Sequence, residues 1–127
     1  MDETLVLLDT NFFLVPFQLG VNIFSELDRV LQTNYTLVTL SPQLDELTRL
    51  SKDAKKGSDK TAARIGLELA RGMRVIESPL KGDEAILDFA KRNKCIVCTN
   101  DSELRKKLKG MRTRTIFVRN RQKLALE

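Results

Sequence analysis

The sequence LVLLDTN at residues 5–11 decides the fold of this chain. Its four consecutive apolar residues are too few for a helix face and lack the polar alternation of a half-exposed strand. They therefore predict a short strand buried on both faces, as in the middle of a parallel sheet. The strand ends at Asp9, and ligand sites of open α/β sheets lie just beyond the carboxyl ends of the strands. Asp9 is thus placed where chemistry usually occurs, although a carboxylate there can also simply open a turn.

The size and charge of the chain limit its possible functions. We expect residues 1–127 to form one domain with a single core. No apolar run approaches the roughly 18 to 20 residues needed to cross a bilayer, so we expect a cytoplasmic protein without a membrane partner. The net charge of +5 favours a polyanionic partner such as nucleic acid.

Histidine is absent from the sequence, which excludes Ser-His-Asp and Cys-His catalysis and histidine-bound zinc. Catalysis must therefore use carboxylates, lysines or the two cysteines. The spacing of Cys95 and Cys98 imitates a redox or zinc half-site, but the CIVC sequence predicts a buried strand, in which residues three apart point to opposite faces. Because no second cysteine pair completes a metal site, we interpret both as small core residues.

Four further strands are predicted, each rich in β-forming residues, at residues 35–40, 74–77, 95–98 and 115–118. Helical patterns separate them, and Ser41 followed by Pro42 predicts the start of one helix. This alternation predicts a compact three-layer α/β/α sandwich around a central, mainly parallel five-stranded sheet. Residues 51–60 are polar and basic and predict a mobile connector between helices. Residues 119–127 are predicted to be a basic tail.

Four carboxylates fall at the carboxyl edge of this predicted sheet, at Asp9, Glu46, Asp83 and Asp101. Each has an ordinary explanation, because Asp83 and Asp101 suit helix caps and Glu46 suits a solvated helix face. Gathered in one crevice, however, they would repel one another and become protonated unless a cation held them. A small set of oxygen ligands suits Mg²⁺ or Mn²⁺.

Four segments resemble the PIN-domain family of metal-dependent ribonucleases, and the resemblance covers nearly the whole chain. They are LLDTN at residues 7–11, SPQLDEL at 41–47, GDEAI at 82–86 and VCTND at 97–101. The resemblance implies that the catalytic, metal-binding residues are Asp9, Glu46, Asp83 and Asp101. It implies supporting roles for Asn11, Thr99 and Glu84.

Two acids next to this set need separate interpretation. Glu84 neighbours Asp83, and because some family members carry two adjacent acids here, it can exchange roles with Asp83. Asp45 lies beside Glu46 but differs from it by about 100° around a helix. We therefore expect Asp45 to point to solvent.

The resemblance implies an endoribonuclease that hydrolyses phosphodiester bonds of single-stranded RNA with one or two Mg²⁺ or Mn²⁺ ions. It covers both VapC-type toxins and PIN nucleases that mature ribosomal RNA, so the expected protein partner is an antitoxin or a ribosome-assembly factor. A homodimer is also expected, because PIN domains commonly pair. Two alternatives stay open: a non-catalytic RNA-binding scaffold, which would have lost metal-binding acids, and a receiver-like phosphoacceptor, which would carry paired acids near its first strand.

Basic residues gather in two segments of the sequence. One follows Asp101 and contains Arg105, Lys106, Lys107 and Lys109; the other is the predicted connector, with Lys52, Lys55 and Lys56. Such runs favour binding of an RNA backbone without sequence choice, although each can also be a solvated surface. With one Tyr, six Phe and no Trp in the chain, we expect little recognition by base stacking.

Overall fold

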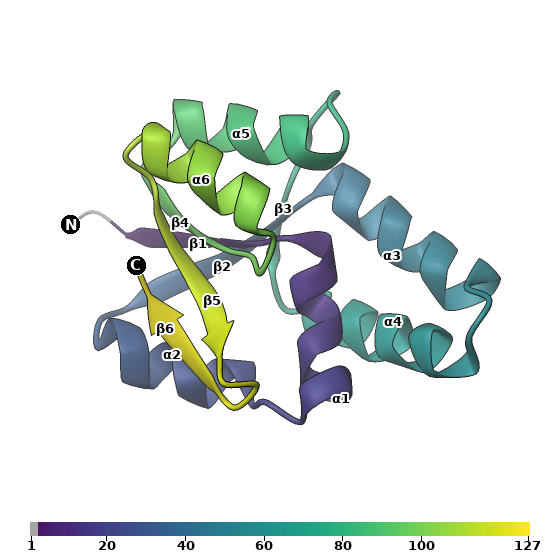
Figure 1. The fold of residues 1–127 in the computed structure, drawn as a ribbon. Helices are drawn as coiled ribbons and strands as arrows, with labels where there is room; N and C mark the ends of the chain where they lie inside the picture. Colours follow the sequence, from purple (N-terminus) through teal and green to yellow (C-terminus); the bar gives the residue numbers. More distant parts are fainter. Residues whose placement is uncertain (1–2) are drawn as a thin grey trace.

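A single six-stranded sheet organises the structure, a computed structural model that describes residues 3–127 (Figure 1). The strands are β1 (Thr4–Leu8), β2 (Tyr35–Leu40), β3 (Arg74–Ile76), β4 (Cys95–Cys98), β5 (Arg114–Arg119) and β6 (Lys123–Leu126). Their order across the sheet is β3-β2-β1-β4-β5-β6. The first five run parallel and β6 runs antiparallel to β5. As predicted, β1 lies inside the sheet, between β2 and β4.

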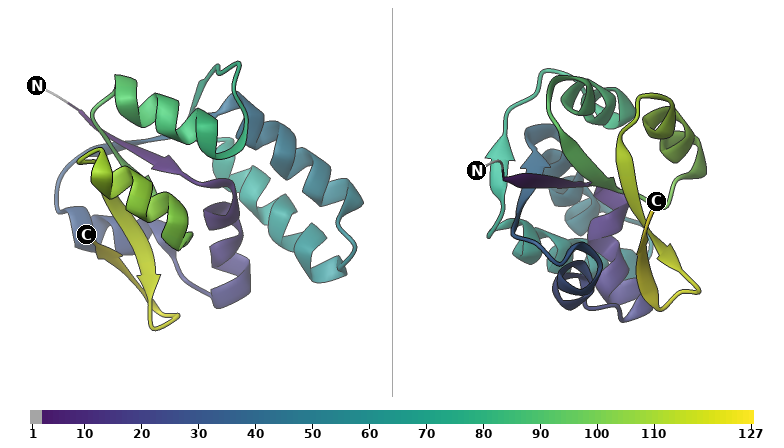
Figure 2. Two further views of the ribbon diagram at one scale, coloured as in Figure 1. Left: turned by 45° about the horizontal axis from the view of Figure 1, so that its top comes forward. Right: turned by 90° about the vertical axis from the view of Figure 1, so that its left-hand side faces the viewer.

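Helices cover both faces of the sheet. They are η1, a 3-10 helix (Thr10–Leu14), α1 (Val15–Leu19), α2 (Ile23–Leu31), α3 (Ser41–Asp53), α4 (Gly57–Ala70), α5 (Gly82–Arg92) and α6 (Ser102–Gly110). Helices α5 and α6 pack on one face, and η1, α1, α2 and α4 lie on the other (Figure 2). The predicted α/β/α sandwich is therefore confirmed. Within residues 3–127, no helix is both long and apolar enough to cross a membrane.

The two faces of the sheet belong to two separate cores, so the expectation of a single core is wrong. Successive strand residues point to opposite faces, so Leu7 packs with α5 and α6, whereas Val6 and Leu8 pack with the helices on the other side. Cys98 shares the core of Leu8, and Cys95 packs against the core of Leu7. Burial raises the pKa of Cys95 to about 11. The interpretation of both cysteines as core residues that point apart is therefore confirmed.

The carboxyl-terminal end differs from the predicted tail over residues 119–127, because it contains the sixth strand. Side chains of α2 bind the backbone of β6: Glu26 Oε1 accepts the N–H of Leu124 at 2.9 Å, and Arg29 donates to the carbonyl of Leu124 at 2.8 Å. A strand as short as KLAL carries a weak pattern of its own. Its pairing depends on β5 and α2, which are remote in sequence, so the sequence alone did not predict it.

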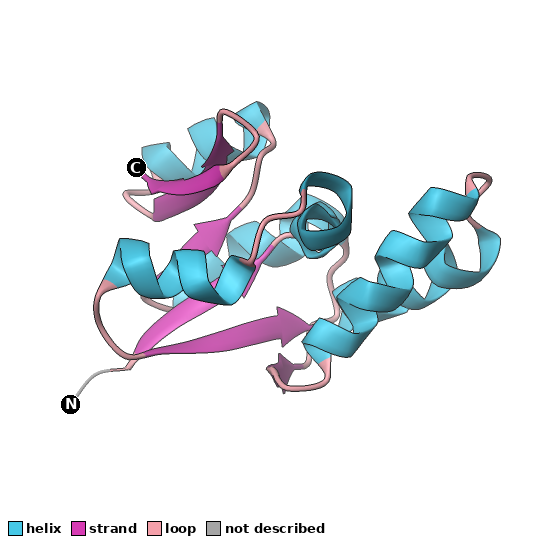
Figure 3. Ribbon diagram, turned by 90° about the horizontal axis from the view of Figure 1, so that it is seen from below, coloured by secondary structure: helices cyan, strands magenta, loops and turns pink. Residues whose placement is uncertain are grey.

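The predicted connector at residues 51–60 is also mostly helical. Helix α3 continues to Asp53 and α4 begins at Gly57, which leaves a turn of only three residues between them. The two helices form a hairpin that projects beyond the carboxyl edge of the sheet (Figure 3). The end of this hairpin is largely exposed and its residues are polar. A polar segment without an apolar stripe has the pattern of a loop, which is why its sequence does not predict helix.

Candidate active site

Strand β1 places Asp9 at the carboxyl edge of the sheet. The backbone N–H of Asp9 donates to the carbonyl of Cys98 at 2.9 Å, which extends the pairing of β1 with β4 by one residue. The Asp9 carboxylate is held by Thr99, whose Oγ1 donates to Oδ2 at 2.9 Å. The same hydroxyl accepts the backbone N–H of Asp101 at 3.1 Å. One fully buried threonine therefore joins the ends of β1 and β4 to the start of α6.

Asp101 is the N-cap of α6. Its Oδ1 accepts the backbone N–H groups of Glu103 at 2.9 Å and Leu104 at 3.2 Å. The capping explanation for Asp101 is thus correct, and it does not exclude a role in the site, since the cap fixes the carboxylate at the edge where Asp9 lies. The prediction of Asp83 as a helix cap is wrong, because the N-cap of α5 is Lys81, the helix begins at Gly82, and Asp83 is exposed in its first turn.

The pKa of Asp9 depends on the charges of two other predicted acids. Burial raises the pKa of Asp9 above its ordinary value, while the hydrogen bond from Thr99 acts to lower it. The negative charges of Asp83 and Asp101 raise the pKa of Asp9 further. Charges act on each other in this way only over short distances. The carboxylates of Asp83 and Asp101 thus lie near enough to Asp9 for their charges to act on it.

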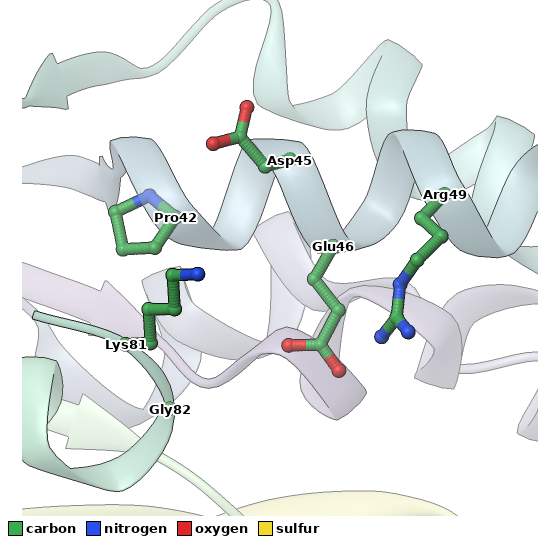
Figure 4. A pocket seen from close by; sticks show the side chains of 6 residues that line it. All are labelled: Pro42, Asp45, Glu46, Arg49, Lys81 and Gly82. Atoms are coloured by element: carbon green, nitrogen blue, oxygen red, sulfur yellow. The ribbon is translucent and has the colours of Figure 1, made fainter.

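Glu46 lies on α3 and lines a cleft of about 520 Å³ (Figure 4). The other lining residues are Pro42, Asp45, Arg49, Lys81 and Gly82. Gly82 adopts a φ of 57°, in the left-handed region that favours glycine, as the chain enters α5. The cleft therefore places Glu46 beside the segment that leads directly into Asp83. In Figure 4, the side chain of Asp45 points to the opposite side of α3 from Glu46, in agreement with the sequence prediction.

These acids do not form a ready metal site. Among residues 3–127, no three Asp, Glu or Cys side chains are grouped closely enough to hold a metal ion as they stand. One oxygen of Asp101 is directed to the amides of α6. The donor set nevertheless fits a hard divalent cation in kind, because it consists of carboxylate oxygens, and the charges of Asp83 and Asp101 already raise the pKa of Asp9.

The three predicted supporting residues differ in their contacts. Thr99 bonds directly to Asp9. Asn11 is exposed in η1, and Glu84 is exposed next to Asp83 in the first turn of α5. Within the described residues, neither Asn11 nor Glu84 makes a side-chain hydrogen bond to the four acids.

Gln43 is a site residue that the sequence analysis did not single out. Its buried side chain donates through Nε2 to the carbonyl of Leu8 and accepts through Oε1 the N–H of Leu40 at 2.9 Å. It therefore joins the end of β1, next to Asp9, to the start of α3, which carries Glu46. The prediction of Ser41 as the N-cap is wrong, because Leu40 is the N-cap and Ser41 is the first residue of α3. A glutamine at the third position of a helix can reach back to the residue before the helix, and that was the available signal.

The predicted RNA-binding residues lie in two separate places. Lys106, Lys107 and Lys109 are exposed on α6, the helix that Asp101 caps. Arg105 is different: its guanidinium lies 3.8 Å from the centre of the Phe117 ring and forms an ion pair with Glu127 at 3.1 Å. The exposed residues Lys52, Lys55 and Lys56 lie at the far end of the α3–α4 hairpin (Figure 1). The lysines of α6 thus lie on the helix that Asp101 caps, and the hairpin lysines do not.

The fold and the acids define a class of protein, an α/β domain with a carboxylate centre at the carboxyl edge of its parallel strands. Residues 6–121 match the family described as a PIN like domain, and the chain therefore belongs to that family. This assignment places it with PIN domains and not with receiver domains.

Named relatives agree with the family. The chain is 37% identical over 117 residues to "Ribonuclease VapC4" of Methanocaldococcus jannaschii, which covers 90% of this chain and 89% of the relative. It is 32% identical over 101 residues to "Ribonuclease VapC9" of Archaeoglobus fulgidus, covering 80% of this chain and 73% of the relative. The PIN domain endonuclease Utp24 has the same fold, with a TM-score of 0.80, 24% identity, and coverage of 97% of this chain and 90% of that one. The names of the two VapC relatives support a nuclease, and the likeness to Utp24 shows the fold.

Proposed function

We propose that this chain is a metal-dependent endoribonuclease that hydrolyses phosphodiester bonds of single-stranded RNA. The residues that would hold Mg²⁺ or Mn²⁺ are Asp9, Glu46, Asp83 and Asp101. The observation that carries the proposal is the environment of Asp9, a half-buried carboxylate whose pKa is raised by burial and by the charges of Asp83 and Asp101. A divalent cation offsets such a concentration of negative charge. When bound, the ion supplies a Lewis acid that activates water and neutralises charge on the phosphate oxygens.

Hydrogen bonds within the chain position the carboxylates of Asp9 and Asp101. Thr99 fixes one oxygen of Asp9 and leaves the other free of that bond. The capping bonds of Asp101 hold its carboxylate at the start of α6. Because the sequence contains no histidine, proton transfer at this site falls to carboxylates and solvent. The RNA backbone is expected to follow the exposed lysines of α6, which begin about one turn into the helix that Asp101 caps.

The names of the two VapC relatives favour a toxin-type role with a protein antitoxin as partner. A role in ribosomal RNA processing is the alternative, and its expected partner is a ribosome-assembly factor. We also propose a homodimer. Light scattering of the purified chain measures its mass in solution, and a mass equal to one chain would contradict the dimer.

The experiment that tests the nuclease is cleavage of end-labelled single-stranded RNA with Mn²⁺, Mg²⁺ or EDTA. The wild type is compared with Asp9→Asn and Asp101→Asn, and each substitution is expected to lower kcat by about a hundredfold or more, since metal activation contributes several kcal/mol. Glu46→Gln has a matched control in Asp45→Asn, the neighbouring acid that points away from Glu46 (Figure 4). The control is expected to keep full activity.

Two outcomes contradict the proposal in different ways. Activity that persists in Asp9→Asn, or in EDTA, places cleavage at another site or in a contaminant. Tight RNA binding without cleavage under every metal condition identifies the non-catalytic scaffold instead. Double-stranded RNA and single-stranded DNA of the same sequence serve as comparison substrates for the expected preference.

A further inference from the structure

We infer that Arg49 and Lys81 form a phosphate-binding subsite that holds the RNA backbone next to the linkage that is cleaved. This inference rests on the proposed function, because it assigns part of the substrate path to the cleft beside Glu46. The cleft is about 520 Å³ in volume, which is large enough for a nucleotide rather than for an ion alone.

The two cations enter the cleft from different elements. Arg49 lies three residues after Glu46 on α3, so both side chains extend from the same side of that helix. Lys81 lies in the segment immediately before α5 and approaches from the opposite wall (Figure 4). A group bound between them lies next to Gly82 and hence beside Asp83. The subsite is therefore adjacent to the acidic centre and not remote from it.

Neither Arg49 nor Lys81 forms an ion pair with an acid in the described part of the chain. Five arginines form ion pairs with acids, namely Arg29, Arg71, Arg74, Arg92 and Arg105. Arg49 is not one of them, and Lys81 makes no ion pair either. A guanidinium presents a planar set of donors that matches phosphate, and an ammonium adds a compact charge. Two such groups facing one cleft are available for an anion from outside the chain.

The negative charge of the site explains why Arg49 and Lys81 are needed beside it. The carboxylates of the proposed metal centre repel a polyanionic strand, so backbone phosphates near them need positive groups of the protein. The lysines of α6 lie on the side of Asp101, whereas Arg49 and Lys81 lie on the side of Glu46. Asp45 also lines the cleft, but its carboxylate points to the other side of α3 (Figure 4). The strand would thus be held on both sides of the acids.

The first test measures binding without cleavage. Fluorescence anisotropy of labelled single-stranded RNA is recorded with Asp9→Asn, and with the same chain carrying Arg49→Ala or Lys81→Ala, between about 50 and 200 mM salt. Each added substitution is expected to weaken binding about tenfold, as for loss of one charge-assisted contact. Each is also expected to reduce the slope of log affinity against log salt by about one.

Two matched controls distinguish the loss of a contact at the subsite from a general effect of lower net charge. Arg64→Ala removes an exposed arginine of α4, and Lys94→Ala removes an exposed lysine just before β4, at the other edge of the sheet. Both are expected to leave the salt slope nearly unchanged. Equal losses in the controls and in Arg49→Ala or Lys81→Ala would show a general charge effect and overturn the subsite.

The second test locates the phosphate. Cleavage by the wild type and by a variant with both Arg49→Ala and Lys81→Ala is measured on substrates in which one linkage at a time is an uncharged methylphosphonate. One position beside the cleaved linkage is expected to lower kcat/KM of the wild type about tenfold and to leave the double variant unaffected. If the methylphosphonate and the double substitution lowered kcat/KM additively at every position, a direct contact would be contradicted.

A third measurement distinguishes the subsite from a purely structural pair of counterions to Glu46. Calorimetric titration with Mn²⁺ is expected to give the same affinity for the wild type and for Arg49→Ala. A changed Mn²⁺ affinity with an unchanged salt slope would overturn the inference. Failure of the proposed nuclease is recognised separately, because it appears as activity retained in Asp9→Asn or as absence of cleavage, whereas the binding test needs no cleavage.

Discussion

Thr99 donates a hydrogen bond of 2.9 Å to the carboxylate of Asp9, although the two residues are ninety positions apart in the sequence. An ionised carboxylate can only accept a hydrogen bond, so the hydroxyl of Thr99 is the donor, and its oxygen also accepts the N–H of Asp101. A hydroxyl has one proton to give, and here it goes to Asp9. The orientation of the central acid therefore depends on one buried side chain that couples β1, β4 and α6.

Substitution Thr99→Val keeps the shape of the side chain and removes this coupling. The bond from Thr99 acts to lower the pKa of Asp9, so its loss is expected to raise that pKa further in the metal-free chain. We expect RNA cleavage to fall by about tenfold to a hundredfold, as for other supporting contacts of metal ligands. Carboxyl NMR titration and cleavage kinetics measure the two effects. Thr99→Ser, which restores the hydroxyl, is expected to recover both, and its failure to do so would assign the loss to packing.

Asp9 is expected to destabilise the metal-free fold at neutral pH. Its pKa is raised in the folded chain, chiefly by burial, so the folded state binds its proton more tightly than the unfolded state does. The contribution of Asp9 to stability therefore decreases as the pH rises from the ordinary value of 3.8 through the raised pKa, and it stays lower above it. Asp9→Asn is expected to raise the melting temperature of the metal-free chain at neutral pH.

The control for this prediction is Asp45→Asn, an exposed acid on α3, which is expected to leave the melting temperature unchanged. The gain from Asp9→Asn should also disappear below about pH 3, where Asp9 is protonated in both states. Addition of Mn²⁺ is expected to stabilise the wild type and not Asp9→Asn. A lower melting temperature for metal-free Asp9→Asn at neutral pH would contradict the argument.

The sequence predicted those parts of the molecule that depend on local pattern. The strand that ends at Asp9 follows from an apolar run, and Asp101 follows from the capping preference of helix starts. The position of β6 does not follow from its own residues, because Glu26 and Arg29 of a distant helix complete its hydrogen bonds. Gln43 was missed for a similar reason, since the carbonyl that it binds belongs to Leu8, at the end of another strand.

Glu26 is predicted to hold β6 in a manner that depends on pH. Hydrogen bonds from Arg29 and from the N–H of Leu124 lower the pKa of Glu26 from 4.5 to about 2. The stabilisation from its charge is therefore complete above pH 4.5 and is lost as the pH falls through about 2. Glu26→Gln is expected to lower the free energy of unfolding by about 1 kcal/mol at neutral pH, a small figure because the side chain is near solvent.

Urea unfolding at a series of pH values measures this difference between wild type and Glu26→Gln, which is expected to shrink toward zero as the pH approaches 2. Glu68→Gln is the control, because its ion pair with Arg71 is exposed on both sides. It is expected to change the free energy of unfolding by less than about 0.5 kcal/mol. A pH-independent loss in Glu26→Gln would show that the carboxylate charge is not the cause.

Gly66 is predicted to be required for the packing of α4 against η1. A Cβ at this position would lie 3.0 Å from the Cβ of Phe13 and 3.2 Å from its carbonyl oxygen. Phe13 is fully buried, so it cannot move away freely. Gly66→Ala is expected to lower the free energy of unfolding by about 1 to 2 kcal/mol, because the crowding exceeds the gain in helix propensity. Gly57→Ala, in the same helix with open space around it, is expected to be neutral or stabilising; equal effects of the two would contradict this.

Arg105 is expected to act on stability, in contrast to the lysines that follow it. Its guanidinium stacks on Phe117 and pairs with Glu127, which joins α6 to the β5–β6 hairpin. Arg105→Ala is therefore expected to lower the free energy of unfolding by about 1 kcal/mol and to change the salt slope of RNA binding little. Lys106→Ala, on the exposed side of the same helix, is expected to keep the stability and to reduce the slope by about one. Urea unfolding and anisotropy on both variants measure the contrast, and a reduced slope with unchanged stability in Arg105→Ala would place Arg105 in the RNA interface after all.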